Sequence, residues 1–328
     1  MRFHYLLRGI LTLCCMLGAS VSTYAADAYP SRSIRMIVPY TAGGNTDVLA
    51  RLLAGRLSQS LGQQVIIENR PGGNTLIGTE AVARAAGDGY TILLTTLTFS
   101  VVPSLYAKLP YDSIKDFTPI TLAVTLPNVL VINPKVPADS LKTFIAYAKE
   151  HPGKVNYAST GSGTSPHLSM EMVKQMAGVN VNHIPYKGGA QAMNDLLGGQ
   201  VQAQFIGLPV AMPLIADGKL RALGVTSAKR AAAAPNLPAI SEVLPGYELN
   251  PWFGILGPAG MPKEITLKLQ KEIAQILRSP DIADQLTKLG AEPVGSTSEQ
   301  FATHLDAEIK RYARFIKEEG ITLEGGRQ

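Results

Sequence analysis

Two loops of the sequence combine glycines with hydroxyl or amide side chains, and each leads into a predicted helix. We name residues 39–45 the first cradle and residues 159–164 the second cradle. Their glycines let the backbone approach a ligand closely. The unpaired N–H groups at the start of a helix carry partial positive charge, so each loop is a candidate binding site for a carboxylate or phosphate. The candidate binding residues are Thr41, Ala42, Gly43, Gly44, Asn45, Ser159, Gly161, Ser162, Gly163 and Thr164.

The spacing of these residues, and of the histidines, does not match the catalytic and cofactor-binding motifs that they resemble. The segment Gly161-Ser162-Gly163 superficially resembles a nucleophile elbow, but that motif requires one residue between the serine and each glycine. The same loop matches only the first two glycines of the dinucleotide fingerprint. No two of the five histidines have the i, i+4 spacing of a helical zinc site. We therefore predict that the protein is not an enzyme and that it has neither a metal nor a cofactor.

The N-terminus has the three parts of a secretory signal peptide. Arg2 and Arg8 precede an apolar run from Gly9 to Leu17, and small residues follow up to Ala25. The run is shorter than the roughly 20 apolar residues that cross a bilayer, so we expect cleavage near Ala25 and not a membrane anchor. Cleavage would remove both cysteines and leave 28 Lys and Arg against 25 Asp and Glu. This small basic excess does not favour nucleic acid as a partner.

Beyond this segment, short β-branched runs alternate with helix-length segments, a pattern typical of an α/β fold with parallel sheets. One helix is expected from Asn45 or Thr46 to the residue before Gly62. Another is expected from Ser165 to the residue before Gly178. The predicted strands are 34–38, 65–67, 91–95, 129–132, 155–158, 181–184, 203–206 and 220–225.

The order of these elements predicts two domains. Three strands precede the connecting stretch 119–127, five strands follow it, and the tail beyond Pro262 is almost purely helical. Because three strands and their own helices give a sheet too little cover, we expect the tail to pack on the first domain. Crossings near 118–128 and 248–256 would then join the domains. The predicted tail helices are 263–278, 281–289 and 298–319, and the predicted boundaries are 1–25 for the signal peptide, 26–127 with 250–328 for domain 1, and 128–249 for domain 2.

Many short motifs follow one another in a fixed order along nearly the whole chain. They are Ile34 to Gly44 with Asp47 and Arg51, Glu68 to Gly72, Asp88 to Thr91, Leu109 to Asp112, Tyr157 to Ser159, His183 to Gly188, Asp195 to Gly199, Gly218 to Leu223, Trp252, and Pro258 to Gly260. In this order, from about Tyr29 to Ile321, the sequence resembles the periplasmic substrate-binding receptors of tripartite tricarboxylate transporters, the Bug receptor family.

The resemblance implies a type II periplasmic binding protein, or Venus flytrap, whose two α/β domains close over a ligand. It implies a periplasmic receptor that hands a small organic carboxylate to integral membrane transporter subunits, and we expect a monomer. It also implies that the two cradles face each other and hold one carboxylate through backbone N–H groups and waters. Neither cradle contains Lys or Arg. Neutral donors suit a receptor that must release its anion, because a buried cation left unpaired is costly.

Ligand choice is expected to depend on residues away from the cradles, because backbone donors bind any carboxylate alike. Threonine hydroxyls there could bind a second carboxylate, whereas Leu97, Phe99 and Leu208 could wall an aromatic ring. We favour a di- or tricarboxylate, in particular a dicarboxylate of roughly four to eight carbons, aromatic acids included. The residues expected to meet the far end of the ligand are Thr95, Thr96, Thr98, Gly189, Ala190, Gly207, Leu208 and Pro209.

Several residues near the expected site keep two interpretations. Asp47 and Arg51 are spaced for a helical ion pair, which favours a structural role over ligand contact. His167 could donate to the anion or be a core imidazole, and Lys187 could reach the ligand, although a solvated lysine is preferred. Trp252 fits core or hinge packing. The alternative functions are a ligand-sensing adaptor for a signalling partner and an enzyme with an unrecognised site on a similar scaffold.

Overall fold

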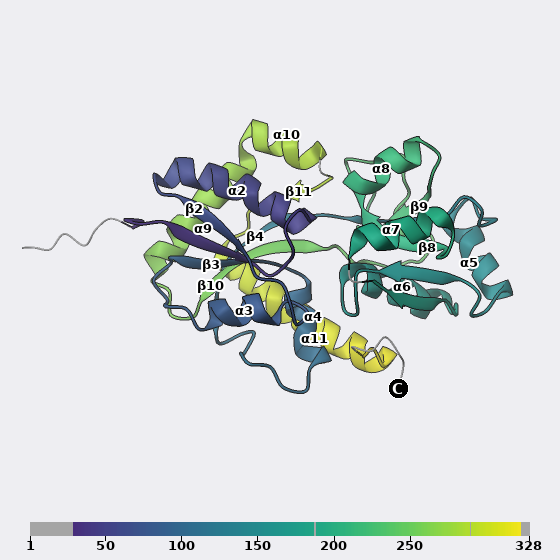
Figure 1. Ribbon diagram of the computed structural model, residues 1–328, viewed down its shortest axis with the longest axis horizontal. Coiled ribbons are helices and arrows are strands. Elements are labelled where there is room, and N and C mark those ends of the chain that lie inside the picture. The colour runs from purple at the N-terminus through teal and green to yellow at the C-terminus, as the bar shows by residue number, and fades with distance from the viewer. Residues whose placement is uncertain (1–28, 187, 289, 323–328) are drawn as a thin grey trace, which may run out of the picture. The chain divides into compact units, whose positions relative to one another are not determined.

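The computed structural model describes residues 29–186, 188–288 and 290–322 (Figure 1). The expected signal peptide with Ala25, and Lys187, lie outside the described residues. Contacts within the chain separate a short N-terminal unit that ends at Ser31 from a unit that begins at Arg32, and every strand and helix named below belongs to the second unit. In the described ranges, no helix combines the length and the hydropathy needed to cross a membrane.

Six strands form a mixed sheet in the order β11-β4-β10-β3-β1-β2. β1 pairs in parallel with β2 and β3, whereas β10 runs antiparallel between β3 and β4. Every residue of β1 except Arg35 is buried, as expected for a strand in the interior of an α/β sheet. The strands are β1 (Ile34–Val38), β2 (Val65–Asn69), β3 (Thr91–Thr96), β4 (Phe117–Thr125), β10 (Trp252–Pro258) and β11 (Glu292–Pro293).

Five strands form a second mixed sheet in the order β7-β6-β8-β5-β9. β6 pairs in parallel with β7 and β8, whereas β5 is antiparallel to β8 and β9. β5 is buried along its whole length. The strands are β5 (Asn128–Ile132), β6 (Asn156–Ser159), β7 (Asn182–Pro185), β8 (Ala203–Gly207) and β9 (Arg221–Val225).

Helices connect and cover both sheets (Figure 1). Both predicted helix stops are confirmed, because Gly62 and Gly178 are left-handed C-caps of α2 and α6. The helices are α2 (Asn45–Leu61), α3 (Leu76–Ala83), α4 (Thr98–Leu105), α5 (Leu141–Glu150), α6 (Ser165–Ala177), α7 (Gly189–Gly198), α8 (Leu208–Ala216), the short 3-10 helix η1 (Ile240–Glu242), α9 (Lys263–Arg278), α10 (Pro280–Lys288) and α11 (Ser298–Glu319).

The helical tail packs on the six-stranded sheet, as predicted. α9 and α11 both contact β4, α9 also contacts α2, and α11 lies along α4. Phe301 of α11 lies directly over Gly254 of β10, where a Cβ atom would collide with its ring. The side chains of Phe301 and Trp252 meet edge to face, with ring centroids 5.5 Å apart. Trp252, only 1% exposed, is therefore a core residue at the start of β10.

All eight predicted strands are present, but two further long strands fall where connecting segments were expected. β4 occupies most of the stretch 119–127, and β10 occupies the second crossing. The prediction of parallel sheets is also wrong in part, because β10 and β5 each run antiparallel to both of their neighbours. Pro119 suggested a linker, yet it lies opposite Leu256 at a register shift of the β4–β10 pair, where a residue without an N–H is tolerated.

The chain crosses from the six-stranded to the five-stranded sheet at Leu126 and Pro127, between β4 and β5, and returns just before β10. The backbone N–H of Leu126 donates to the carbonyl oxygen of Pro251 at 2.8 Å, so the two crossings are hydrogen-bonded to each other. Immediately beyond, the N–H of Asn128 donates to the hydroxyl of Thr226, and the N–H of Thr226 donates to the carbonyl of Asn128, both at 2.9 Å.

Candidate functional site

The first cradle turns one of its backbone N–H groups inward. Gly43 has a φ of +84°, and its N–H donates to Oδ2 of Asp47 at 3.0 Å. Thr41 to Gly44 are exposed. Gly44 is the N-cap of α2 and no side chain caps this helix, so first-turn N–H groups of α2 are available to a ligand at the exposed loop.

Asp47 holds the first cradle in place by accepting three hydrogen bonds. Its carboxylate accepts from Nε of Arg51 at 2.9 Å and from Nδ2 of Asn69 at 3.0 Å, in addition to the N–H of Gly43. These hydrogen bonds, the one from Arg51 first, lower the pKa of Asp47 to about 2, although burial opposes the shift. Asn69 also donates to the carbonyl oxygen of Tyr40 at 3.1 Å. Asp47 and Arg51 therefore shape the loop, in agreement with the structural interpretation.

The second cradle is also held by internal hydrogen bonds. The N–H of Gly161 donates to Oγ of Ser159 at 3.1 Å, and Oγ1 of Thr164 donates to the carbonyl of Gly161 at 2.7 Å. The N–H of Gly163 donates to Nδ1 of His167 at 3.0 Å. Thr164 is the N-cap of α6, and its side chain does not cap the helix. Ser162 is partly exposed, and the first turn of α6 contains Pro166, which has no N–H to donate.

His167 lies behind the second cradle in a stack of aromatic rings. Its ring centroid is 4.1 Å from that of His183, which in turn lies 5.0 Å from that of Tyr157. Nε2 of His183 is 2.6 Å from Oγ of Ser159. Burial lowers the pKa of His167 to about 4 and that of His183 to about 3. Both imidazoles are therefore neutral at neutral pH.

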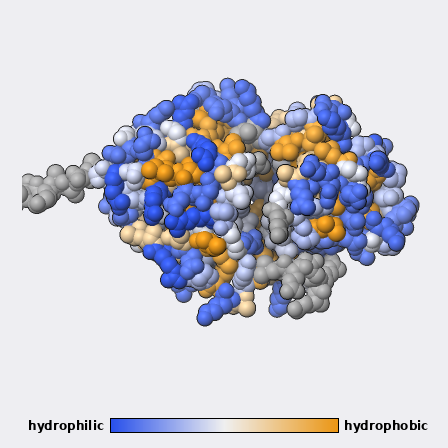
Figure 2. Space-filling model, in the orientation of Figure 1, coloured by the Kyte–Doolittle hydropathy of each residue, from blue (hydrophilic) through white to orange (hydrophobic). Residues whose placement is uncertain are grey.

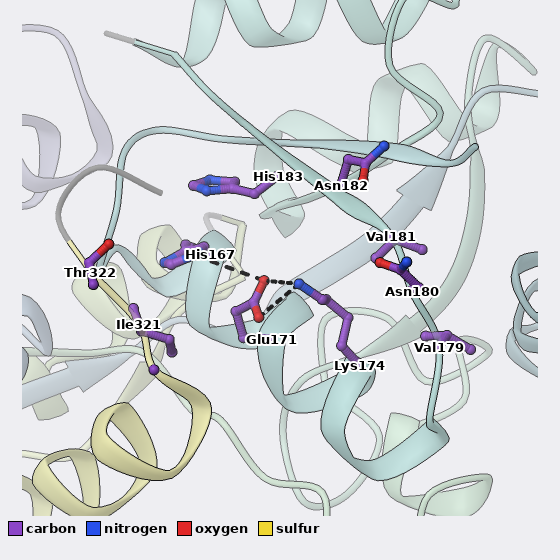
Figure 3. Close-up of a pocket in the computed structure, with 11 residues that line it drawn as sticks. His167, Glu171, Lys174, Val179, Asn180, Val181, Asn182, His183, Ile321 and Thr322 are labelled. Atoms are coloured by element: carbon purple, nitrogen blue, oxygen red, sulfur yellow. Dashed lines mark hydrogen bonds and ion pairs between the residues drawn. The ribbon is translucent and has the colours of Figure 1, made fainter. Parts of the chain in front are cut away.

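A pocket of about 570 Å³ is lined by the two histidines of this stack (Figure 3). Glu171 lies beneath His167 in the pocket, and Nζ of Lys174 donates to both of its carboxylate oxygens, at 2.6 and 2.9 Å. The hydroxyl of Tyr157 donates to the same carboxylate at 2.6 Å. The remaining lining comes from the segment before and at the start of β7 and from the residues that follow α11.

Two kinds of helix start occur in the molecule. α5 and α11 begin with capping boxes, in which Ser140 and Thr297 accept N–H groups of their own helices. α2, α3, α4, α6, α7, α8 and α9 begin without a side-chain cap, and of these α2, α6, α7 and α8 begin at the loops predicted to bind the ligand. Uncapped starts leave first-turn donors available, which is what a site for an anion requires.

The threonines predicted to select the ligand differ in exposure. Thr95 and Thr98 are buried, and only Thr96 is partly exposed. The Thr96 hydroxyl lies 2.6 Å from the Tyr40 hydroxyl and donates to that of Thr98 at 3.3 Å, which links this segment to the first cradle. The hydroxyl of Thr95 has no hydrogen-bond partner among the described residues.

The apolar residues suggested as walls for an aromatic ring lie in the core. Leu97, Phe99 and Leu208 are each 1% exposed, and Phe99 packs edge to face on Phe117. Their contact with a ligand stays a prediction. α8 instead exposes Val210 and Met212, and hydrophobic residues gather over this helix in Figure 2.

The structure places part of the predicted site together. A Cβ atom at Gly189 would lie 4.0 Å from the methyl group of Thr160, so the start of α7 adjoins the second cradle. Gly163 packs against Val101 and Leu105 of α4. Gly207 and Pro209 are partly exposed at the start of α8. Among the described residues, no hydrogen bond joins the first cradle to the second, so a shared ligand stays a prediction.

Sequence reasoning missed the internal acceptors of the cradles. Asp47 and His167 each follow a cradle glycine by four residues, and this shared spacing was the available signal. Metal binding has no support in the described residues, where no three His, Cys, Asp or Glu side chains gather in a way that could hold an ion.

Two domains with mixed sheets, between which the chain crosses twice, are the fold of the class of periplasmic binding proteins. Within that class the chain belongs to the tripartite tricarboxylate transporter family receptors, whose model matches residues 49–321. The chain is 39% identical to protein BugT of Bordetella pertussis over 318 residues, which are 96% of this chain and 97% of BugT.

Solved structures show the same relationship. The R. palustris protein Rpa4515 with adipate is 38% identical, with a TM-score of 0.83 over 90% of this chain and 99% of that one. MatC from Rhodopseudomonas palustris with bound malate is 30% identical, with a TM-score of 0.78 over 88% of this chain and 100% of that one. The predicted family and the two-domain fold are therefore confirmed, and the chain is a solute-binding receptor of this family.

Proposed function

We propose that this protein captures a small organic dicarboxylate between its two domains and delivers it to integral membrane transporter subunits. The observation that carries the proposal is the pair of uncapped helix starts, α2 and α6, each behind a glycine loop without Lys or Arg. The adipate and malate bound to two of its structural neighbours support the class of ligand. The binding role of a family receptor needs no catalysis, and the protein acts as a receptor and not as an enzyme.

The donors for the ligand are the outward-facing N–H groups of the cradles and of the first turns of α2 and α6. The N–H groups of Gly43, Gly161 and Gly163 already have internal acceptors, so they fix the loops and do not bind the ligand. Each helix start stabilises a nearby anion by roughly 0.3 to 1 kcal/mol. Several such weak contacts bind a carboxylate without a cation and allow it to leave again.

The domains in this proposal are 26–127 with 250–328 and 128–249, which keeps each sheet within one domain. The hydrogen-bonded crossings at Leu126 and Pro251 are the hinge, and a ligand that both cradles contact favours the closed arrangement. The protein works as a monomer in the periplasm and has no nucleic acid partner. Export removes the signal peptide near Ala25, which the intact mass of the exported protein measures.

The residues that meet the far end of the ligand select among organic acids. Thr96 is the partly exposed member of the threonine segment, and its hydroxyl is positioned by Tyr40. Together with the backbone of the segment Gly207 to Pro209, it provides polar groups for a second carboxylate, while the buried Thr95 and Thr98 lie behind it. Gly189 and Ala190 extend this end of the site from the start of α7, where both are exposed.

The test is to give α2 an internal cap that competes with the ligand. Gly44 has φ −81° and ψ 170°, and a Cβ atom there would meet only the carbonyl of Thr41 at 3.8 Å, so an aspartate fits. In Gly44→Asp the new carboxylate takes the first-turn N–H groups and repels an anion. We expect calorimetry with adipate or malate to show affinity at least about tenfold weaker.

Gly44→Ala is the matched control, because it adds the Cβ atom without the charge, and it should bind within about twofold of the natural protein. The aspartate should also stabilise the fold by about 1 kcal/mol, which separates lost binding from lost folding. Equal affinity in the natural protein and Gly44→Asp would remove α2 from the site. Absence of binding to either acid by the natural protein would contradict the proposed ligand class.

A further inference from the structure

The hydrogen bond between Gly163 and His167 fixes the state of the imidazole. Nδ1 of His167 accepts the N–H of Gly163 at 3.0 Å, so this nitrogen carries no proton and the proton of the neutral ring is on Nε2. His167 is 3% exposed. If Nδ1 were protonated, two N–H groups would point at each other and the hydrogen bond would be lost. The position of Gly163 therefore depends on a neutral His167.

Gly163 has no side chain with which to hold its own position. Its φ is +76°, and its α-carbon faces Leu105 and Val101 of α4, with Cγ1 of Val101 3.2 Å from the place of a Cβ atom. Gly163 thus lies between α4 and the imidazole of His167. Movement of the imidazole, or loss of its acceptor, leaves the neighbouring Ser162 and Thr164 without this anchor.

The charged and titratable groups around His167 come from three elements. Glu171 and Lys174 lie on its own helix α6, with Oε1 of Glu171 3.9 Å from Nε2 of His167. Tyr157 of β6 and His183 of β7 stack beside it. Glu171 and Lys174 neutralise each other as an ion pair, so no net charge favours protonation of the imidazole, and burial lowers its pKa.

The pocket gives water a route to this group. His167 and His183 both line it, together with Glu171 and Lys174 (Figure 3). Both imidazoles therefore border a cavity through which protons can reach them in the folded protein.

We propose that His167 is the positioning residue of the second cradle, which holds Gly163 through its neutral imidazole, and that protonation of His167 releases the loop and weakens ligand binding in acid. The inference rests on the proposed function for its effect on binding, but the link between His167 and Gly163 is independent of any ligand. A positioning residue acts through Gly163 and does not itself touch the carboxylate.

Two substitutions separate the acceptor from the ring. In His167→Asn, Oδ1 takes the place of Nδ1, one bond from Cγ, so the acceptor is kept and its titration is removed. In His167→Phe, the ring is kept and the acceptor is removed. His151→Asn is the control, because His151 is an exposed histidine at the end of α5.

The first measurement is amide exchange of Gly163 by NMR in the ligand-free protein. We expect protection of the Gly163 amide in the natural protein and in His167→Asn, and its loss in His167→Phe. On acidification, protection should fall in the natural protein as His167 titrates, and it should persist in His167→Asn. Equal protection in all three proteins, or equal loss on acidification, would overturn the proposal.

The second measurement is the affinity for adipate at about pH 7.5 and about pH 3.4, below the pKa of His167 of about 4, where most of the His167 rings are protonated. Adipate itself gains protons in this range, so the natural protein is compared with His167→Asn and His151→Asn. We expect about a fivefold larger loss of affinity on acidification in the natural protein and in His151→Asn than in His167→Asn. His167→Phe should bind about tenfold more weakly at the higher pH.

These results separate the two proposals. If the natural protein does not bind adipate, the ligand class fails, while exchange at Gly163 still decides whether His167 positions the loop. If adipate binds and His167→Asn loses affinity on acidification as much as the natural protein does, the pH-dependent positioning is wrong and the receptor function stands.

Discussion

In the first cradle an ionised carboxylate accepts a glycine N–H, whereas in the second cradle a neutral imidazole does. The geometry is otherwise the same: Gly43 donates to Asp47 and Gly163 donates to His167, each at 3.0 Å and each four residues ahead of its acceptor. Both acceptors lie in the first turn of a helix. The two domains thus share one arrangement, a glycine N–H that donates to a side chain four residues later, although the two acceptors differ in charge.

The difference in charge separates the pH ranges in which the two loops are stable. The folded protein lowers the pKa of Asp47 from 3.8 to about 2, so its contribution is complete above 3.8 and is lost as pH falls through about 2. It lowers the pKa of His167 from 6.5 to about 4, so the neutral imidazole contributes fully above 6.5 and loses its contribution as pH falls toward about 4. Mild acid therefore affects the second cradle alone.

Alanine at the two cradle glycines should show the largest difference. Gly43 and Gly163 both have positive φ, at +84° and +76°, but a Cβ atom at Gly43 has no neighbour within 4 Å, whereas at Gly163 it collides with Leu105. We expect Gly43→Ala to lower the free energy of unfolding by about 1 kcal/mol and Gly163→Ala by about 3 kcal/mol, measured by urea denaturation. Equal losses would mean that α4 yields to the added methyl group.

Removal of the charged acceptor should have the next largest effect. Asp47→Ala leaves the N–H of Gly43 and the amide of Asn69 without their acceptor, which should lower the free energy of unfolding by about 2 kcal/mol. Asp306 is the control, because it forms an i, i+4 pair with Lys310 at the surface. Asp306→Ala should cost less than about 0.5 kcal/mol. A similarly small loss of unfolding free energy for Asp47→Ala would contradict its role in holding the first cradle in place.

The smallest expected effect is on the pH dependence of stability between about pH 7 and pH 5. His167→Asn should reduce the loss of unfolding free energy over this range by about 1 kcal/mol, because it removes a group that the unfolded chain protonates more readily. Asp47→Asn should leave the loss unchanged, because Asp47 titrates below this range in both states. If the unfolding free energies of the natural protein and His167→Asn changed equally with pH, the two cradles would not differ in their response to acid.

The elements flanking the cradles could be predicted from the sequence because their signals are local. Gly62 and Gly178 end helices through their own backbone conformation. The β-branched runs of β1 and β5 predict buried strands from their own side chains, and both strands are buried. β10 could not be predicted in this way. Its Gly254 weakens the strand signal, and the reason for that glycine is Phe301, which lies 47 residues later in the chain and packs on it.

The loops of the candidate site could be recognised from the sequence, but the orientation of their N–H groups could not. Glycine spacing locates the loops, but it does not tell which N–H groups turn inward. That choice depends on distant partners, such as Asn69 on β2 and His183 on β7, which hold Asp47 and Ser159. The same limitation applies to the threonine segment, where the Thr96 hydroxyl lies 2.6 Å from the hydroxyl of Tyr40, a residue far away in the sequence.

The position of Trp252 makes the crossings visible to spectroscopy. It is the one tryptophan of the sequence, it follows Pro251 directly, and its ring meets those of Phe301 and His304 edge to face. Indole emission depends on the polarity around the ring, and at 1% exposure this ring is shielded from water. Selective excitation of tryptophan therefore observes a single place in the protein, one residue from the carbonyl that joins the two crossings.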